Sequence, residues 1–151
     1  NGLGTYSFFD KRQSEFNLRR TIIADNAGHY LAQTTMPVGY GCPPEGTTQA
    51  LLNKLGRHGN RPSHVHYFVS APGYRKLTTQ FNIEGDQYLW DDFAFATRDG
   101  LVAVAVDVSD AAELQRLGAT APVKHITFNV ELVKDQATAP TSEVDRRRVA
   151  A

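Results

Sequence analysis

The sequence predicts an all-β fold, a β-sandwich with one or two short helices and long loops. Short runs rich in β-branched and aromatic residues alternate with turn residues along most of the chain. Long helices of the kind that connect parallel strands in α/β folds are missing from the pattern. At 151 residues, 41% of them hydrophobic and 21% charged, the chain is long enough for one domain with an ordinary core.

The first part of the chain is predicted to form hairpins. Residues 5–9 are a short β-prone run, and residues 20–24 and 30–35 are predicted strands on either side of an Asp-Asn-Ala-Gly turn at 25–28. Residues 39–46 contain two prolines and three glycines, so they are predicted to form a loop.

The clearest helix is predicted over residues 47–55, where a run that starts with residues suited to an N-cap is stopped by Gly56. It would span about two to three turns. We expect residues 1–135 to form the β-sandwich domain and the polar residues 136–151 to form a loosely held tail. Further strands are predicted at 64–70, 76–82, 101–108 and 125–133, with turns at 72–73 and 84–86 and one or two helical turns at 110–117.

Charge and composition narrow the choice of partners. Sixteen basic and sixteen acidic side chains cancel, and the only basic cluster is the short run at 146–148, so nucleic acid is not an expected partner. No run of about 18 apolar residues is present, which argues against membrane insertion. Cys42 stands alone, so an internal disulfide is impossible, which fits a reducing cytoplasm. Because the chain starts at Asn1 rather than Met, we expect it to be part of a longer polypeptide.

The most informative short motif is His64-Val65-His66, at the start of the predicted strand 64–70. Residues two apart on a strand project from the same face, so the two imidazoles are expected side by side. Taken alone, such a pair is more often a solvated face or a hydrogen-bonded pair than a metal site. Metal binding therefore requires further ligands from other segments.

Three runs around this motif resemble a known family. They are residues 37–44 (PVGYGCPP), 56–66 (GRHGNRPSHVH) and 71–80 (APGYRKLTTQ). In sequence and spacing they closely resemble the intradiol ring-cleaving dioxygenases, and among these the C-terminal catalytic portion of bacterial catechol 1,2-dioxygenases. The likeness extends from about Asn1 to Val133.

The resemblance implies one non-haem Fe(III) per subunit, held by Tyr6, Tyr40, His64 and His66. Ferric iron prefers anionic oxygen donors, and binding to it removes the proton of a phenol whose free pKa is about 10. Two tyrosinates would offset most of the charge of the buried ion. In the resembled enzymes Tyr40 corresponds to the ligand that catechol displaces, and Gly39 and Gly41 would give its loop the freedom to move.

The same resemblance gives roles to residues near the ligands. Arg61 resembles the guanidinium that faces the bound ring, and Gln80 resembles its hydrogen-bonding companion. Taken alone, Arg61 would more often form a surface ion pair. Phe93, Ala94 and Cys42 resemble walls of the substrate pocket, although an aromatic residue in such a run is ordinarily part of a core. Structural or solvated roles are predicted for His29, His58 and His125. Packing roles, with hydroxyls that bond to local partners, are predicted for Tyr30, Tyr67, Tyr74 and Tyr88.

The implied activity is the cleavage of catechol by O2 to cis,cis-muconate. One alternative is a related enzyme that acts on a chlorocatechol, hydroxyquinol or protocatechuate. Another is a catalytically silent β-sandwich fragment that binds iron or carbohydrate. The resemblance also implies a homodimer, formed through an N-terminal helical region that this sequence lacks, with bound phospholipid.

Overall fold

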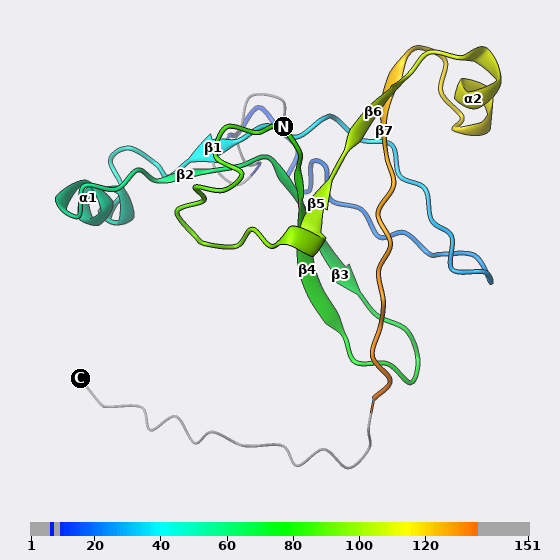
Figure 1. The fold of residues 1–151 in the computed structure, drawn as a ribbon, viewed down its shortest axis with the longest axis horizontal. Helices are drawn as coiled ribbons and strands as arrows, with labels where there is room; N and C mark the ends of the chain where they lie inside the picture. Colours follow the sequence, from blue (N-terminus) through cyan, green and yellow to red (C-terminus); the bar gives the residue numbers. More distant parts are fainter. Residues whose placement is uncertain (1–6, 8–9, 136–151) are drawn as a thin grey trace.

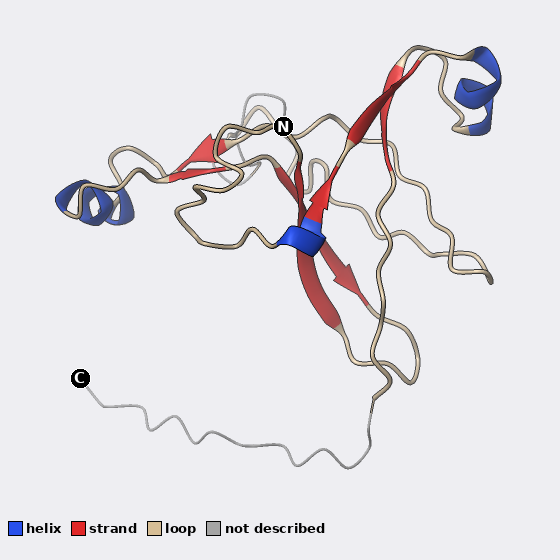
Figure 2. Ribbon diagram, viewed as in Figure 1, coloured by secondary structure: helices blue, strands red, loops and turns tan. Residues whose placement is uncertain are grey.

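The structure is a computed structural model that describes residue 7 and residues 10–135 of the chain. Within these residues strands and loops dominate and both α-helices are short, which confirms the predicted all-β class (Figure 1, Figure 2). The elements in chain order are β1 (Tyr40–Gly41), α1 (Thr47–Lys54), β2 (Asn60–Arg61), β3 (His64–Val69), β4 (Leu77–Ile83), the 3-10 helix η1 (Asp99–Leu101), β5 (Val102–Ala103), β6 (Ala105–Val108), α2 (Ala111–Arg116) and β7 (Val123–Ile126).

The strands form small sheets. β1 pairs with β2, and β6 pairs with β7, both in antiparallel fashion. A third sheet has the order β3-β4-β5, in which β3 and β4 are antiparallel and β5 joins β4 in parallel. Figure 1 shows the β3–β4 hairpin at the centre of the molecule, with α1 and α2 at opposite ends.

The β3–β4 hairpin follows the prediction closely. Gly73, in the predicted Pro-Gly turn, has a left-handed φ of 78°, a conformation that favours glycine. The pairing of the two strands runs from His64 opposite Asn82 to Val69 opposite Leu77. This register fixes which side chains share a face of the sheet.

One face of the hairpin carries the core. Phe81 and Ile83 of β4 are buried, and Val65 and Tyr67 of β3 pack against them. Phe128, in the segment that follows β7, covers the same face, with its ring centroid 4.7 Å from that of Phe81. The intervening residues of both strands therefore project from the opposite face.

The predicted strands at 20–24 and 30–35 are wrong. The turn between them is present, since the Asp25 N–H donates to the His29 carbonyl (2.9 Å) and Asp25 Oδ1 accepts from the His29 N–H (2.8 Å). Their apolar side chains remain exposed, Ile23 by 91%. A two-stranded ribbon without a buried face is marginal in water, so its residue pattern does not produce regular strands. The run at 5–9 lies largely outside the described residues.

Both predicted helices are confirmed. The N-cap residue of α1 is Gly46, so this helix has no side-chain cap at its start. Gly56, with a left-handed φ of 65°, follows its end. α2 is capped by Asp110, whose carboxylate accepts from the Glu113 N–H (3.0 Å). None of the helices in the described residues has the length and apolar character needed to cross a membrane.

The predicted strand at 101–108 is broken in two. β5 pairs with β4 and β6 pairs with β7, so the chain passes from one sheet to another at Val104. The predicted strand at 125–133 is also shorter and begins earlier, as β7. It ends at Ile126 because its partner there, Ala105, is the first residue of β6. Strand length is thus set by the partner rather than by the local pattern.

Phe81→Ala should lower the free energy of unfolding by about 3 to 5 kcal/mol, because it removes a buried ring that packs against Tyr67 and Phe128. Phe68→Ala is the matched control on the paired strand. Phe68 is 71% exposed, so its loss should cost less than about 1 kcal/mol. Urea unfolding followed by circular dichroism measures both. Equal losses would contradict the placement of the core on the Phe81 face.

Candidate active site

The site is organised around the guanidinium of Arg61. Arg61 lies in β2, where antiparallel pairing with β1 places it directly opposite Tyr40. Its Nη1 is 3.4 Å from the Tyr40 hydroxyl and 3.2 Å from His64 Nε2. Its Nη2 donates to Gln80 Oε1 (3.1 Å), and its Nε forms a salt bridge with Asp92 Oδ1 (3.1 Å). One cation thus joins the sequence-predicted residues Tyr40, His64 and Gln80.

His64 and His66 lie side by side, as their spacing predicts. Their ring centroids are 4.8 Å apart, with the rings perpendicular at 90°. His64 Nδ1 is 2.7 Å from the Pro62 carbonyl oxygen, so Nδ1 is assigned the proton and Nε2 keeps its lone pair. Burial lowers the pKa of both imidazoles below the usual value, and the Arg61 cation acts in the same direction. Both rings are therefore neutral at pH 7, which is the form that binds metal.

Three of the four predicted iron ligands lie close together. The ring centroids of Tyr40 and His64 are 5.6 Å apart, and the Tyr40 oxygen and His64 Nε2 both contact the same Arg61 nitrogen. Tyr6 lies outside the described residues. Throughout the described ranges, no three His, Cys, Asp or Glu side chains gather in a metal-binding arrangement. The phenol of Tyr40 lies next to the two imidazoles. Phenolate oxygen with neutral imidazole is a donor set that fits ferric iron.

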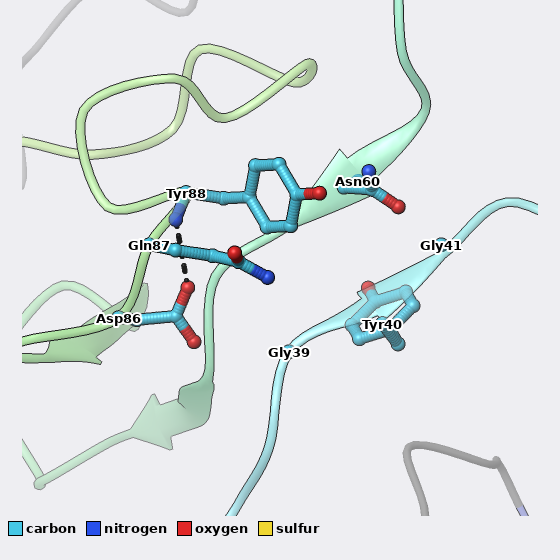
Figure 3. Close-up of a pocket in the computed structure, with 7 residues that line it drawn as sticks. All are labelled: Gly39, Tyr40, Gly41, Asn60, Asp86, Gln87 and Tyr88. Carbon is cyan, nitrogen blue, oxygen red and sulfur yellow. Dashed lines mark hydrogen bonds between the residues drawn. The ribbon is translucent and has the colours of Figure 1, made fainter.

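Two pockets adjoin these side chains. The first, of about 330 Å³, is lined by Tyr40, and Figure 3 shows it between β1, β2 and the loop after β4. The second, of about 400 Å³, is lined by His66 and Gln80. The first pocket is completed by Gly39, Gly41, Asn60, Asp86, Gln87 and Tyr88, and the second by Thr78, Thr79, Ala96, Arg98 and Leu101. Arg61 therefore contacts a lining residue of each pocket.

The predicted pocket walls Phe93, Ala94 and Cys42 line neither of these two pockets, and they lie on two segments next to them. Phe93 and Ala94 belong to the loop after β4, and the Phe93 N–H donates to the Asn60 carbonyl of β2 (3.2 Å). Cys42 directly follows β1, and its N–H donates to the Gly59 carbonyl (2.9 Å). The Cβ of Cys42 lies close to Gly59. Backbone contacts thus hold the Phe93 loop against the strand that carries Arg61.

Asn82 belongs to the site but was not singled out by the sequence. It is fully buried, directly opposite His64 in the hairpin register. Its Oδ1 accepts from Gln80 Nε2 (2.9 Å), and its Nδ2 donates to Thr97 Oγ1 (3.0 Å). The signal that could have found it is the register of the predicted hairpin, which puts Asn82 on the same face as the histidines.

The sequence also did not single out two aspartates of the site, Asp86 and Asp92. Asp86 Oδ2 accepts from the Ser63 N–H (2.9 Å), just before β3, and its Oδ1 accepts from the Tyr88 N–H (2.9 Å), the bond drawn in Figure 3. Asp92 pairs with Arg61 although 31 positions separate them. No local pattern predicts that Asp86 binds the Ser63 N–H or that Asp92 binds Arg61, because 23 and 31 positions separate these pairs.

Gly39 and Gly41 allow β1 to approach β2 closely. A Cβ on Gly39 would lie 2.9 Å from the Arg61 carbonyl oxygen, and a Cβ on Gly41 would lie 3.0 Å from Asn60 Oδ1. Neither glycine has a left-handed φ. Their role in the described structure is close packing next to Tyr40.

Comparison with known proteins gives the class to which this fold and site belong. Residues 1–133 match the family described as Dioxygenase, and the chain belongs to that family. The resemblance that the motifs around Tyr40 and His64 predicted is thereby confirmed.

Several similar proteins are catechol 1,2-dioxygenases. The one from Acinetobacter guillouiae is 74% identical over 140 residues, which are 93% of this chain and 46% of that relative. The crystal structure of wild-type catechol 1,2-dioxygenase from Acinetobacter radioresistens matches with a TM-score of 0.88 at 79% identity, over 100% of this chain and 49% of that one. A chlorocatechol 1,2-dioxygenase from Cupriavidus pinatubonensis is 36% identical over 137 residues, 90% of this chain and 49% of that relative. The chain spans about half the length of the relatives it matches.

Gly39→Ala should lower the free energy of unfolding by about 1 to 3 kcal/mol, because the new methyl group would meet the Arg61 backbone and force β1 away from β2. Gly100→Ala is the matched control, since a Cβ there meets nothing within 4 Å. Thermal unfolding of the two variants measures the difference. A Gly39 variant as stable as the Gly100 variant would show that the close approach is not required.

Proposed function

We propose that this chain forms the iron-binding and substrate-binding part of an intradiol dioxygenase that cleaves catechol with O2 to cis,cis-muconate. The observation that carries the proposal is the Arg61 guanidinium, which contacts Tyr40, His64 and Gln80 together. The similarity to catechol 1,2-dioxygenases over nearly the whole chain supports the same function. We place the catalytic unit in residues 1–135.

The metal that we propose is one non-haem Fe(III), held by Tyr6, Tyr40, His64 and His66. The proposal is supported by the neutral imidazoles, by the lone pair at His64 Nε2 and by the nearby Tyr40 oxygen. The chemistry that ferric iron supplies when bound is chelation of the two catechol oxygens and activation of the ring toward O2. The protein residues supply charge balance and position.

Tyr40 has two roles in this proposal. As a phenolate it would offset positive charge at the site, and Arg61 Nη1, 3.4 Å from its oxygen, would limit the cost of that negative charge in a partly buried position. In this proposal catechol would displace Tyr40, and Tyr40 Oη would accept a proton from a catechol hydroxyl. Binding of the substrate and its deprotonation are then coupled at one atom.

Arg61 provides the fixed positive charge. Its Nε and Nη2 are held by Asp92 and Gln80, so the guanidinium plane is already oriented before substrate binds. A preoriented cation stabilises negative charge that develops on the catecholate ring without further rearrangement. Gln80 is itself fixed by Asn82, whose Oδ1 accepts from Gln80 Nε2, and this contact holds Gln80 next to Arg61.

Catechol is the substrate we propose, in preference to its substituted forms. The support is the contrast between 74% identity to a catechol 1,2-dioxygenase and 36% to a chlorocatechol 1,2-dioxygenase. We propose Phe93, Ala94 and Cys42 as pocket walls. Comparison of kcat/KM for catechol, a chlorocatechol, hydroxyquinol and protocatechuate tests this choice, and a higher value for a substituted ring would reassign the substrate.

For the whole protein, we propose the cytoplasmic homodimer with bound phospholipid that the family resemblance implies. The support is that resemblance alone. Light scattering of the whole protein tests the dimer, and lipid extraction with mass spectrometry of the same sample tests the bound phospholipid.

His64→Ala and His66→Ala should each remove bound iron and the visible absorption that tyrosinate gives to ferric iron, because each variant deletes one of four proposed ligands. His29→Ala is the control, since its side chain is 83% exposed in a turn near Asp25. Iron content by mass spectrometry and the visible spectrum measure the outcome. Full iron content in either ligand variant would exclude that histidine as a ligand.

Arg61→Gln should keep iron and slow turnover by about 10²- to 10³-fold, the usual effect of losing one preoriented electrostatic group. Arg116→Gln, on α2, removes an exposed arginine paired with Glu113 and should leave turnover unchanged. Oxygen consumption with catechol measures the rates. Wild-type turnover in the Arg61 variant would reject a catalytic role for this residue.

A further inference from the structure

Asp92 is the buried partner of the Arg61 guanidinium. Its side chain is 1% exposed, and that of Arg61 is 11% exposed. Asp92 Oδ1 accepts from Arg61 Nε (3.1 Å), and Oδ2 accepts from Nη2 (3.2 Å). Two parallel contacts fix both the position and the plane of a guanidinium, which a single contact cannot do.

The Asp92 carboxylate is itself fixed by hydrogen bonds from backbone N–H groups. Oδ1 also accepts from the Ala94 N–H (3.0 Å), and Oδ2 accepts from the Ala96 N–H (3.2 Å). The Phe95 N–H between them donates to the Asp92 carbonyl (2.9 Å). Phe95 has a left-handed φ of 53°, which costs free energy for a residue with a side chain and persists where surrounding contacts determine it. Asp92 is therefore built into a tight turn and cannot follow a displaced arginine.

The arrangement leaves Arg61 Nη1 directed toward the reaction site. With Nε and Nη2 engaged by Asp92, and Nη2 also by Gln80, the remaining nitrogen contacts Tyr40 and His64. Gln80 provides only one oxygen to this guanidinium. The orientation of Nη1 thus depends chiefly on Asp92.

We propose that Asp92 is a positioning residue for the ring-cleavage reaction, which acts by fixing the orientation of Arg61. The inference rests on the proposed function and extends it to a residue that does not touch the substrate. Loss of the Asp92 carboxylate should reduce the stabilisation of charge in the transition state while leaving the iron ligands in place.

The first test is Asp92→Asn in the whole, iron-loaded protein. Asparagine keeps the size of the side chain but replaces one accepting oxygen with a donating NH2 group, which in either orientation opposes one Arg61 N–H and one backbone N–H. We expect kcat for catechol to fall about 10- to 100-fold with KM changed less than about threefold, because the lost interaction matters mainly in the transition state. Iron content and the visible spectrum should stay as in the wild type.

Asp91→Asn is the matched control. Asp91 is the neighbouring residue, but its side chain is 80% exposed and pairs with His58 (3.0 Å). We expect wild-type kcat, KM and iron content for this variant. A loss in kcat as large as that of the Asp92 variant would mean that any change in this loop slows turnover, and it would overturn the specific role of Asp92.

A double-mutant cycle separates positioning from a general structural role. If Asp92 acts through Arg61, the double variant R61Q/D92N should turn over about as slowly as R61Q alone. A double variant that is slower by the full factor of D92N would show that Asp92 acts independently of Arg61. That outcome would overturn the proposal.

The mobility of the Arg61 side chain can be measured without catalysis, in the iron-free protein. In ¹⁵N NMR spectra the Arg61 Nε–H should exchange slowly with water in the wild type, because it is buried and bonded to Asp92, and at least tenfold faster in D92N. Unchanged exchange in D92N would contradict the positioning role. Should D92N fail to fold, Asp92→Glu replaces it: slow turnover with retained iron supports the proposal, and wild-type turnover overturns it.

The two proposals fail in different ways. Wild-type protein that binds no iron and cleaves no catechol would refute the proposed function, whatever the NMR result. Active wild-type protein, with slow R61Q and unimpaired D92N, would refute only the role of Asp92.

Discussion

The antiparallel register of β3 and β4 is the constraint on which the rest of the structure depends. Because side chains alternate along each strand, pairing His64 with Asn82 sends Val65 and Phe81 together to the core and His66 and Gln80 together to the other face. A shift of β3 by one residue would turn its imidazoles toward the core and would turn Val65 and Tyr67 away from it. The energy of burying Phe81 therefore also maintains the site.

Arg61 extends this organisation beyond the hairpin. Removing a guanidinium from water is costly unless its charge and its N–H groups are satisfied, and Asp92 and Gln80 provide that compensation. Burial raises the pKa of Asp92 and the Arg61 contact lowers it, and the net effect is a pKa below the ordinary value. The pair is thus charged at neutral pH, and a positive charge is held next to Tyr40 and His64.

The loops around the site are fixed by side-chain carboxylates rather than by long sheets. Asp86 holds the start of β3 through the Ser63 N–H, and Asp92 holds the turn at Ala94 and Ala96. Among the residues that the structure describes, no buried side-chain polar atom lacks a hydrogen-bond partner. Fully satisfied polar networks of this kind position side chains precisely, which suits a site whose chemistry depends on charge placement.

The sequence by itself determined the features that depend on near neighbours. These are the shared face of His64 and His66, the hairpin turn at Gly73 and the short helices, together with the motifs that indicated the family. Only the tertiary structure decided that Asp92 meets Arg61 across 31 positions, that residues 20–24 and 30–35 do not become strands, and that the chain changes sheets at Val104. These outcomes depend on which distant segments bury one another, and that information is not contained in the periodicity of a single segment.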